Sequence, residues 1–201
     1  MITKPVLAFS FFISLLLIVC SSAATPPPPN TPSFGNATAF IRARCAATRY
    51  PGLCFSSLSP YATSVRRSPL LLALTASNVT IAPLRDLRYR FAALRSRSAP
   101  PSAATHDCAD LLGDAADQAA RALDELREMP DPLRGSTEES WRISNARTWM
   151  SAAMTDEGTC SDEFEHDAGG DVKGDVRRQL ARVKRYTSNA LALLSGLVDL
   201  G

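Results

Sequence analysis

The segment that decides the fold runs from Thr105 to Glu128 and reads THDCADLLGDAADQAARALDELRE. Its apolar and small residues recur every three or four positions in one nearly unbroken stripe, which predicts an amphipathic helix with a single buried face. The members of this stripe are Cys108, Leu111, Leu112, Ala115, Ala119, Ala122, Leu123 and Leu126. Pro130 and Pro132 follow, and because proline cannot continue a helix, this one should end near Met129.

Two further segments, 69–97 and 171–198, have the same periodicity, and no long segment alternates as a strand does. Pro83 should kink or split the first of these helices. Asp171 is a candidate cap for the second. The residues expected to face the core in these segments are Leu72, Ala76, Ile81, Leu84, Leu87, Phe91, Leu94, Val172, Val176, Leu180, Val183, Ala190, Leu191, Leu194 and Val198.

A fourth helix is predicted by its start and stop signals. Ser136 and Glu139 have the spacing of a capping box, which opens a helix expected to run to about Glu157 and to stop at Gly158. An acidic loop at 163–170 should follow. The core-facing residues expected in this helix are Ile143, Ala146, Met150, Ala153 and Met154.

The region before these segments predicts a small helical hairpin. Helical residues begin near Asn36, and the sequence Tyr-Pro-Gly at 50–52 should stop that helix before a short turn at 54–58. Ser59 and Ser68 each precede a proline and have the pattern of a helix cap. Short loops between helices of similar length imply antiparallel neighbours. The sequence therefore predicts an all-α fold, an antiparallel up-down four-helix bundle with an N-terminal helical hairpin.

The N-terminus predicts export. Residues 1–24 have a basic start, an apolar run at 6–19 and a small-residue end, which together indicate a secretory signal peptide. The apolar run is shorter than the ~20 residues that span a bilayer, so no membrane attachment is expected after cleavage. Residues 25–35 contain four consecutive prolines and should form an extended leader, which leaves 36–201 as the folded domain. We therefore expect a secreted, extracellular protein.

Cysteine usage agrees with an oxidising compartment. Cys20 is lost with the signal peptide, and Cys45, Cys54, Cys108 and Cys160 remain, an even number that predicts two disulfides. Four cysteines allow three pairings. Cys45 and Cys54 are close enough in sequence to close a small ring, which would leave the other two to bridge a longer loop. A four-cysteine zinc site is the weaker alternative, because no C-x₂₋₄-C pair is present.

Two N-glycosylation sequons also fit secretion. They are Asn36-Ala-Thr and Asn78-Val-Thr. Both asparagines are candidate glycan sites.

Residues that could carry out chemistry are sparse. Only two histidines occur, His106 and His166, and both lie in acidic polar stretches where a solvated surface is the simpler interpretation than a metal site. No G-x-S-x-G elbow or phosphate-binding glycine loop is present. Oxidised cysteines would leave no thiol nucleophile. We therefore expect no catalytic residues, no metal, no cofactor and a protein that binds rather than catalyses.

Charge is distributed unevenly along a chain whose net charge is only +2. Residues 40–104 carry ten Arg and one Asp, whereas residues 105–175 carry 18 acidic and six basic residues. Residues 176–201 are again basic. The blocks could neutralise each other across helices, or they could make a dipolar molecule that steers onto a charged partner. The small net charge gives no general basis for nucleic-acid binding.

Hydroxyl side chains form a second stripe beside the apolar face of the helix that starts at Ser136. The four residues are Ser144, Thr148, Ser151 and Thr155, spaced at helical intervals. Small side chains let another backbone approach closely at little cost in side-chain entropy. The stripe is therefore a candidate partner-binding face, and close packing inside the bundle is the alternative.

Four motifs, in order and with matching cysteine spacing, resemble the plant invertase/pectin methylesterase inhibitor family. They are CAATRYPGLC (45–54), DCADLLGD (107–114), TWMSAAMTDEGTC (148–160) and SNALAL (188–193). The resemblance covers about residues 35–199. It implies a four-helix bundle with an N-terminal hairpin, with disulfides pairing the first cysteine with the second and the third with the fourth. It also implies a cell-wall inhibitor that lies across the active-site cleft of pectin methylesterase.

Two features of the sequence favour one branch of this family. The invertase-directed branch typically carries Pro-Lys-Phe after the second bundle helix, whereas this chain has PDPLR at 130–134. The run at 148–155 is also more similar to the esterase-directed branch. The expected partner is therefore pectin methylesterase, with invertase as the alternative and an extracellular pectin-binding module, which would use the Arg-rich first half, as an alternative of another class. One departure is Ser-Asp-Glu-Phe at 161–164, where relatives often have glycine before the phenylalanine, so the turn after Cys160 should differ.

Overall fold

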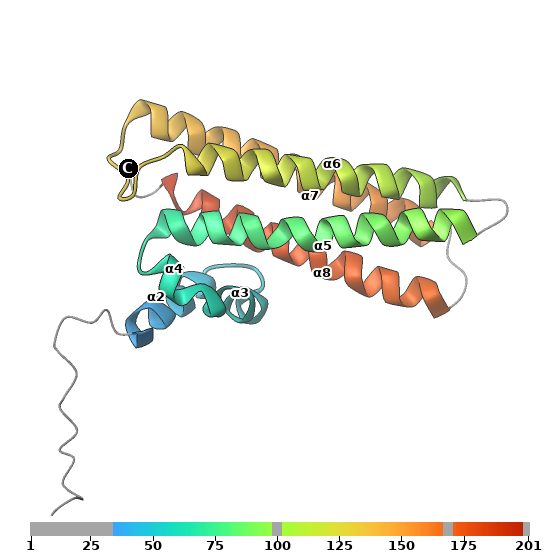
Figure 1. Cartoon of the computed structure of the whole chain (residues 1–201), viewed down its shortest axis with the longest axis horizontal. Helices are drawn as coiled ribbons and strands as arrows, with labels where there is room; N and C mark the ends of the chain where they lie inside the picture. Colours follow the sequence, from blue (N-terminus) through green and yellow to red (C-terminus); the bar gives the residue numbers. More distant parts are fainter. Residues whose placement is uncertain (1–33, 98–101, 167–170, 199–201) are drawn as a thin grey trace, which may run out of the picture. The chain divides into compact units, whose positions relative to one another are not determined.

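The four long helices of the chain run side by side in alternating directions (Figure 1). They are α5 (Pro69–Arg97), α6 (Ala103–Arg127), α7 (Thr137–His166) and α8 (Asp171–Ser195). Each packs against the next, and α8 returns to pack against α5. The computed structural model describes residues 34–97, 102–166 and 171–198, and within these ranges it contains no β-strand. The predicted all-α, up-down four-helix bundle is confirmed.

The N-terminal hairpin is present, but it is more helical than predicted. It consists of α2 (Phe34–Ala46), α3 (Pro51–Leu58), a short 3₁₀ turn η1 (Ser59–Tyr61) and α4 (Ala62–Val65). Pro51 does not stop a helix but occupies the first turn of α3, where its fixed φ and missing N–H are compatible with a helix. Ser59 is not the predicted cap, because it is the first residue of η1 and Leu58 holds the N-cap position. Helix α2 also begins at Phe34, within the segment expected to be leader, and residues 1–33 lie outside the described part of the chain.

Side-chain caps define the starts of three long helices, as polar residues at these positions predict. Ser68 Oγ accepts a hydrogen bond from the Leu71 N–H (3.1 Å), which caps α5. Ser102 caps α6 by accepting from the Thr105 N–H (3.3 Å). The capping box of α7 is complete, because Ser136 Oγ accepts from the Glu139 N–H (3.2 Å) and Glu139 Oε2 accepts from the Ser136 N–H (3.3 Å).

Helix α7 does not stop at Gly158 but continues to His166. A mid-helix glycine costs about 1 kcal/mol relative to alanine. The turns beyond it bury Cys160 and Phe164, and the Phe164 ring meets that of Phe91 edge-on with centroids 5.0 Å apart. Burying a phenylalanine contributes ~1.5–3 kcal/mol, which exceeds the glycine penalty. The acidic loop expected from residue 163, and the altered turn expected after Cys160, are therefore wrong over the described residues.

Helix α5 likewise remains one element through Pro83. The missing N–H of proline costs ~3 kcal/mol, but the turns after it bury Leu84, Leu87 and Phe91 completely or nearly so. The core otherwise follows the predicted stripes. Exceptions are Val198, which is 52% exposed, and Leu94, Leu111, Met154 and Leu191, which are only partly buried. The side chains of Asp171 and Val172 lie outside the described residues.

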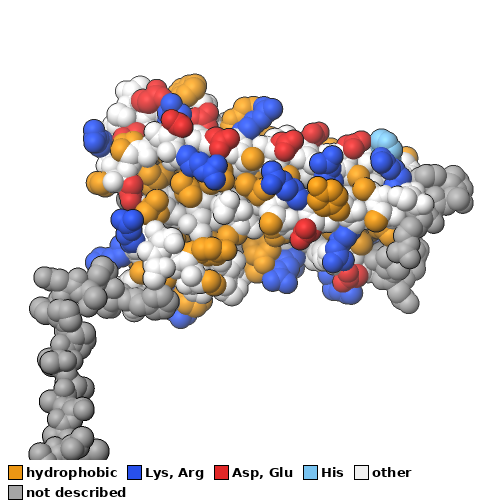
Figure 2. Space-filling model, in the orientation of Figure 1, with side chains coloured by type: hydrophobic (Ala, Val, Ile, Leu, Met, Phe, Trp, Pro, Cys, Tyr) orange, Lys and Arg blue, Asp and Glu red, His pale blue; other side chains and the backbone are white. Residues whose placement is uncertain are grey.

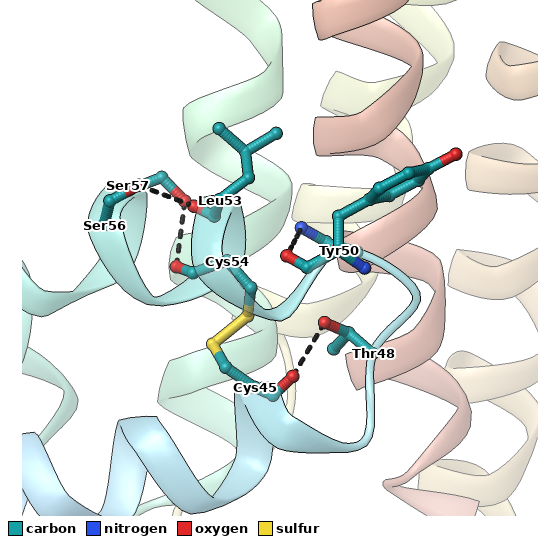
Figure 3. The surroundings of a disulfide bond; sticks show 8 residues. Cys45, Thr48, Tyr50, Leu53, Cys54, Ser56 and Ser57 are labelled. Atoms are coloured by element: carbon teal, nitrogen blue, oxygen red, sulfur yellow. Dashed lines mark hydrogen bonds between the residues drawn. A yellow bond between two sulfur atoms is a disulfide. The ribbon is translucent and has the colours of Figure 1, made fainter.

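Two disulfides pair Cys45 with Cys54 and Cys108 with Cys160, as the family resemblance implied. The first closes the turn between α2 and α3, where Thr48 Oγ1 also donates to the Cys45 carbonyl (2.8 Å; Figure 3). The second ties the start of α6 to the last turns of α7 across 52 residues of sequence. All four cysteines are buried.

A single buried amide joins the hairpin to the bundle. Asn189 of α8 accepts from the Tyr50 N–H (3.2 Å) and donates through its Nδ2 to the Tyr50 carbonyl (3.1 Å). One side chain that is 3% exposed thereby pairs with both backbone groups of Tyr50, whose carbonyl also accepts from the Cys54 N–H (2.9 Å). A backbone group left buried and unpaired is costly, so this contact specifies how the hairpin sits on α8.

Candidate partner-binding face

The hydroxyl stripe of α7 lies on the surface of the bundle. Ser144, Thr148, Ser151 and Thr155 are all exposed, so the stripe does not serve internal helix packing. Together with Leu191 and Ser195 of α8, the stripe lines an open groove of about 540 Å³ between the two helices. The position of this groove follows from the antiparallel pairing of α7 with α8, which the sequence pattern alone does not specify.

The threonine hydroxyls of the stripe use their protons within the helix. Thr148 Oγ1 donates to the Ser144 carbonyl (3.0 Å), and Thr155 Oγ1 donates to the Ser151 carbonyl (3.1 Å). Thr159 continues the pattern by donating to the Thr155 carbonyl (3.2 Å). Because the protons point back at the helix, these oxygens offer lone pairs to the outside. The threonines therefore suit a partner that supplies hydrogen-bond donors, whereas Arg147, which lines the same groove, suits an acceptor.

An exposed tryptophan lies in line with this stripe. Trp141 is 56% exposed and precedes Thr148 by seven residues, which places it on the same side of α7. Exposed aromatic residues are unusual on a helix surface and are enriched among residues that dominate binding energy. Trp141 thus adds a large apolar contact area near the N-terminal end of α7, on the side of the stripe but outside the residues that line the groove.

The charge blocks of the sequence stay largely separate in the fold. Within the described residues, one ion pair, Arg90 to Asp175 (3.6 Å), joins the basic first block to the acidic middle block. Other pairs are formed inside the acidic block, such as Arg142 with Glu125 (3.3 Å). Most acidic side chains visible in Figure 2 lie along the upper part of that view, where Figure 1 places α6 and α7. In the part of the chain that the structure describes, the ion pairs that join a basic block to the acidic one are Arg90 with Asp175 and Arg178 with Asp175.

One acidic residue is enclosed in the core. Glu157 of α7 is 0% exposed, and Thr187 of α8 donates its hydroxyl to Oε1 (2.5 Å) while Oε2 has no hydrogen-bond partner. Burial raises the pKa of Glu157 to about 8, although the Thr187 hydrogen bond and the nearby Lys184 act in the opposite direction. The carboxyl is consequently neutral in the folded protein at mildly acidic and neutral pH.

The reactive groups considered from the sequence do not converge. His106 Nδ1 lies 3.3 Å from Asp107 and 3.5 Å from Asp110 on an exposed helix end, and the side chain of His166 lies outside the described residues. Over the described residues, no group of three or more His, Cys, Asp or Glu side chains is placed to hold a metal ion. Both sequon asparagines, Asn36 and Asn78, are exposed.

Comparison with known proteins decides the family. The model of the plant invertase/pectin methylesterase inhibitor family matches residues 39–193. The chain belongs to this family. Pectinesterase inhibitor 11 of Arabidopsis thaliana is 39% identical over 169 residues, which cover 79% of this chain and 80% of that one. The 21 kDa protein of Daucus carota is 37% identical over 166 residues, with 79% and 83% covered.

A solved structure agrees with the fold of this plant invertase/pectin methylesterase inhibitor family member. The crystal structure of a mutant form of a pectin methylesterase inhibitor from Arabidopsis aligns with a TM-score of 0.61 and 18% identity. The alignment covers 77% of this chain and 95% of that one. At this identity the likeness establishes a shared bundle architecture.

Three features of this inhibitor-family chain were not predicted from the sequence. Thr159 extends the hydroxyl stripe by another helical interval, but the helix was expected to end before it. Trp141 had a signal, its seven-residue spacing from Thr148, that was not used. Glu157 also had a signal, because it follows Met150 by seven residues and Ala153 by four and therefore lies in register with the predicted core stripe.

Proposed function

We propose that this protein is a secreted inhibitor of pectin methylesterase that forms a one-to-one complex and blocks the active-site cleft of the enzyme. The observation that carries the proposal is the family match over residues 39–193, together with relatives such as Pectinesterase inhibitor 11 that are named for this activity. Inhibition of this kind needs a rigid surface and no catalytic group. By this mechanism the protein would regulate the methylesterification of cell-wall pectin.

The groove between α7 and α8 is the surface we propose for the enzyme. Trp141 supplies an aromatic anchor, and Ser144, Thr148, Ser151 and Thr155 supply small hydroxyl groups that allow close approach. The Cys108–Cys160 disulfide holds α7, and core packing holds both helices in place before binding, so little conformational entropy is lost on association. A stable complex of this type buries about 1,600 Å² in total, which is more than the stripe alone offers. Neighbouring parts of α7 and α8 must therefore take part.

The proposed location is the apoplast. The signal peptide at 1–24, two disulfides and two sequons all suit an exported protein. Glycans are proposed at Asn36 and Asn78, and neither lies on the α7–α8 groove. Enzymatic removal of N-glycans from plant-expressed protein should lower its apparent mass, and an unchanged mass would exclude both sites.

Titration of the purified mature protein against a plant pectin methylesterase tests the function. We expect activity to fall in proportion to added inhibitor until one equivalent is reached. Cell-wall invertase is titrated in parallel, and inhibition of invertase alone would replace the proposed target. No effect on either enzyme, with retention on pectin, would favour a pectin-binding module instead.

A further inference from the structure

Three arginines and two tyrosines gather where the hairpin meets α8. Arg49 and Arg185 both lie over the Tyr50 ring, with guanidinium carbons 5.8 Å and 5.4 Å from its centroid. Arg182 lies 5.7 Å from the Tyr186 ring, and its Nε donates to the Tyr186 hydroxyl (3.0 Å). We name this surface, made of Arg49, Tyr50, Arg182, Arg185 and Tyr186, the arginine–tyrosine shelf.

The amide contact between hairpin and bundle explains why these residues meet. Asn189, which binds both backbone groups of Tyr50, follows Arg185 by four residues and Arg182 by seven. The three residues therefore share one side of α8, and the arginines continue that side beyond the edge of the hairpin. Figure 3 shows the Tyr50 side chain lying beside the α8 ribbon. The shelf is thus specified by tertiary structure and joins residues far apart in the sequence.

The arginines of the shelf lack the acidic partners found elsewhere on this helix. Arg178, the next exposed arginine toward the start of α8, pairs with Asp175 (3.5 Å). Arg49, Arg182 and Arg185 are exposed and make no ion pair with any described carboxylate. Three like charges therefore stand together without a counter-charge from the described part of the chain. A bound polyanion would lower the repulsion between them.

We propose that the arginine–tyrosine shelf binds a carboxylated polysaccharide, with de-esterified pectin as the ligand. Guanidinium groups match carboxylates through paired N–H donors. The tyrosine rings, against which the guanidinium groups lie, hold these groups in place. The choice of a polysaccharide over other polyanions rests on the proposed extracellular location, which places the protein among such polymers. The shelf includes none of the residues that line the α7–α8 groove, so the two sites can be tested separately.

Affinity electrophoresis through gels that contain polygalacturonate tests this site. The variant Arg182→Gln/Arg185→Gln removes two shelf charges, and Arg85→Gln/Arg177→Gln is the matched control. Both control arginines are exposed and make no ion pair within the described residues, and they lie outside the shelf. We expect the shelf variant to bind about tenfold more weakly, since two exposed charge contacts are lost, and the control to change about twofold or less. Arg49→Gln, on the hairpin, should give an intermediate loss.

The outcomes distinguish binding at the shelf from non-specific binding by positive charge. Highly methyl-esterified pectin, which lacks most carboxylates, should bind the wild type far more weakly than polygalacturonate does. Three results would each overturn the proposal. The two double variants could lose affinity for polygalacturonate equally, the wild type could bind esterified pectin as tightly as polygalacturonate, or the gel could fail to retain the wild type. Polyphosphate is tested as a second polyanion. If it binds as tightly as polygalacturonate and the shelf variant weakens both to the same degree, the proposal is also overturned, and the shelf binds polyanions in general. Inhibition of pectin methylesterase is measured in parallel. If the shelf variant loses inhibition but binds the polysaccharide as the wild type does, the proposal is overturned and the shelf is a protein interface.

Discussion

Replacing Glu157 with glutamine should abolish a large part of the pH dependence of stability. In the wild type the carboxyl is 0% exposed, and burial raises its pKa from 4.5 to about 8. Glutamine has nearly the same shape and no charge. It keeps an oxygen that can accept from Thr187 Oγ1, which lies 2.5 Å from Oε1 in the wild type.

The sign follows from linkage between protonation and folding. Because the folded-state pKa is the higher one, the folded protein holds this proton more tightly than the unfolded chain does. The stabilisation is fully present below about pH 4.5 and is lost as the pH rises toward about 8. Each pH unit in this window corresponds to ~1.4 kcal/mol, so the whole window amounts to about 5 kcal/mol for this one group.

Urea unfolding of both proteins at pH 5, 6, 7 and 8 measures the effect. The pH slope of the variant should differ from that of the wild type by ~1.4 kcal/mol per unit, which makes Glu157→Gln relatively more stable with each step toward pH 8. Comparing slopes removes any constant cost of the glutamine amide. Glu165→Gln, at an exposed glutamate on the same helix, is the control and should keep the wild-type slope. Parallel slopes for wild type and Glu157→Gln would refute the reasoning.

Three further substitutions test the interface, the second disulfide and the hairpin contact. Thr148→Arg, or Ser151→Arg, should weaken inhibition of pectin methylesterase at least about tenfold by placing a bulky charge in the groove. The melting temperature should be unchanged, and a variant that unfolds would instead assign the stripe to folding. Cys160→Ser should reduce the free energy of unfolding by about 2–5 kcal/mol, measured by urea denaturation, and equal stability would show that this bridge adds nothing. Asn189→Ala leaves the Tyr50 N–H without its partner, whereas the Tyr50 carbonyl keeps its hydrogen bond from the Cys54 N–H; the change should cost about 1–3 kcal/mol, with faster amide hydrogen exchange in the hairpin. Unchanged exchange there would contradict the assigned role of this contact.

Most helix positions could be predicted because each rests on local signals. The stripe at 105–128 and the capping box at 136–139 depend on residues within one or two turns of each other, and the structure reproduces both. The stop predicted at Gly158 and the split predicted at Pro83, both absent from the structure, have one cause. At Gly158 and Pro83 the local signal to stop is real, but burial of Phe164 and Phe91 against other helices outweighs it. A local sequence pattern does not report the energy of such long-range packing.

The candidate site also has features that the sequence predicts and features that depend on contacts between helices. The hydroxyl stripe and the exposed position of Trp141 follow from helical spacing along α7. The groove beside the stripe depends on Leu191 and Ser195, which reach it only because α8 runs antiparallel to α7. The raised pKa of Glu157 likewise depends on burial in a core that other helices complete, against which the Thr187 hydrogen bond acts.

The amino-acid sequence by itself determined the helical class, the caps, the cysteine set and the family, because periodicity, capping and motif spacing are properties of neighbouring residues. Tertiary structure alone decided where helices continue through a glycine or a proline. It also decided which side chain of α8 receives the hairpin and which charges remain without a partner. These outcomes depend on distances between residues up to 139 positions apart, such as Tyr50 and Asn189, and only the packed chain brings them together.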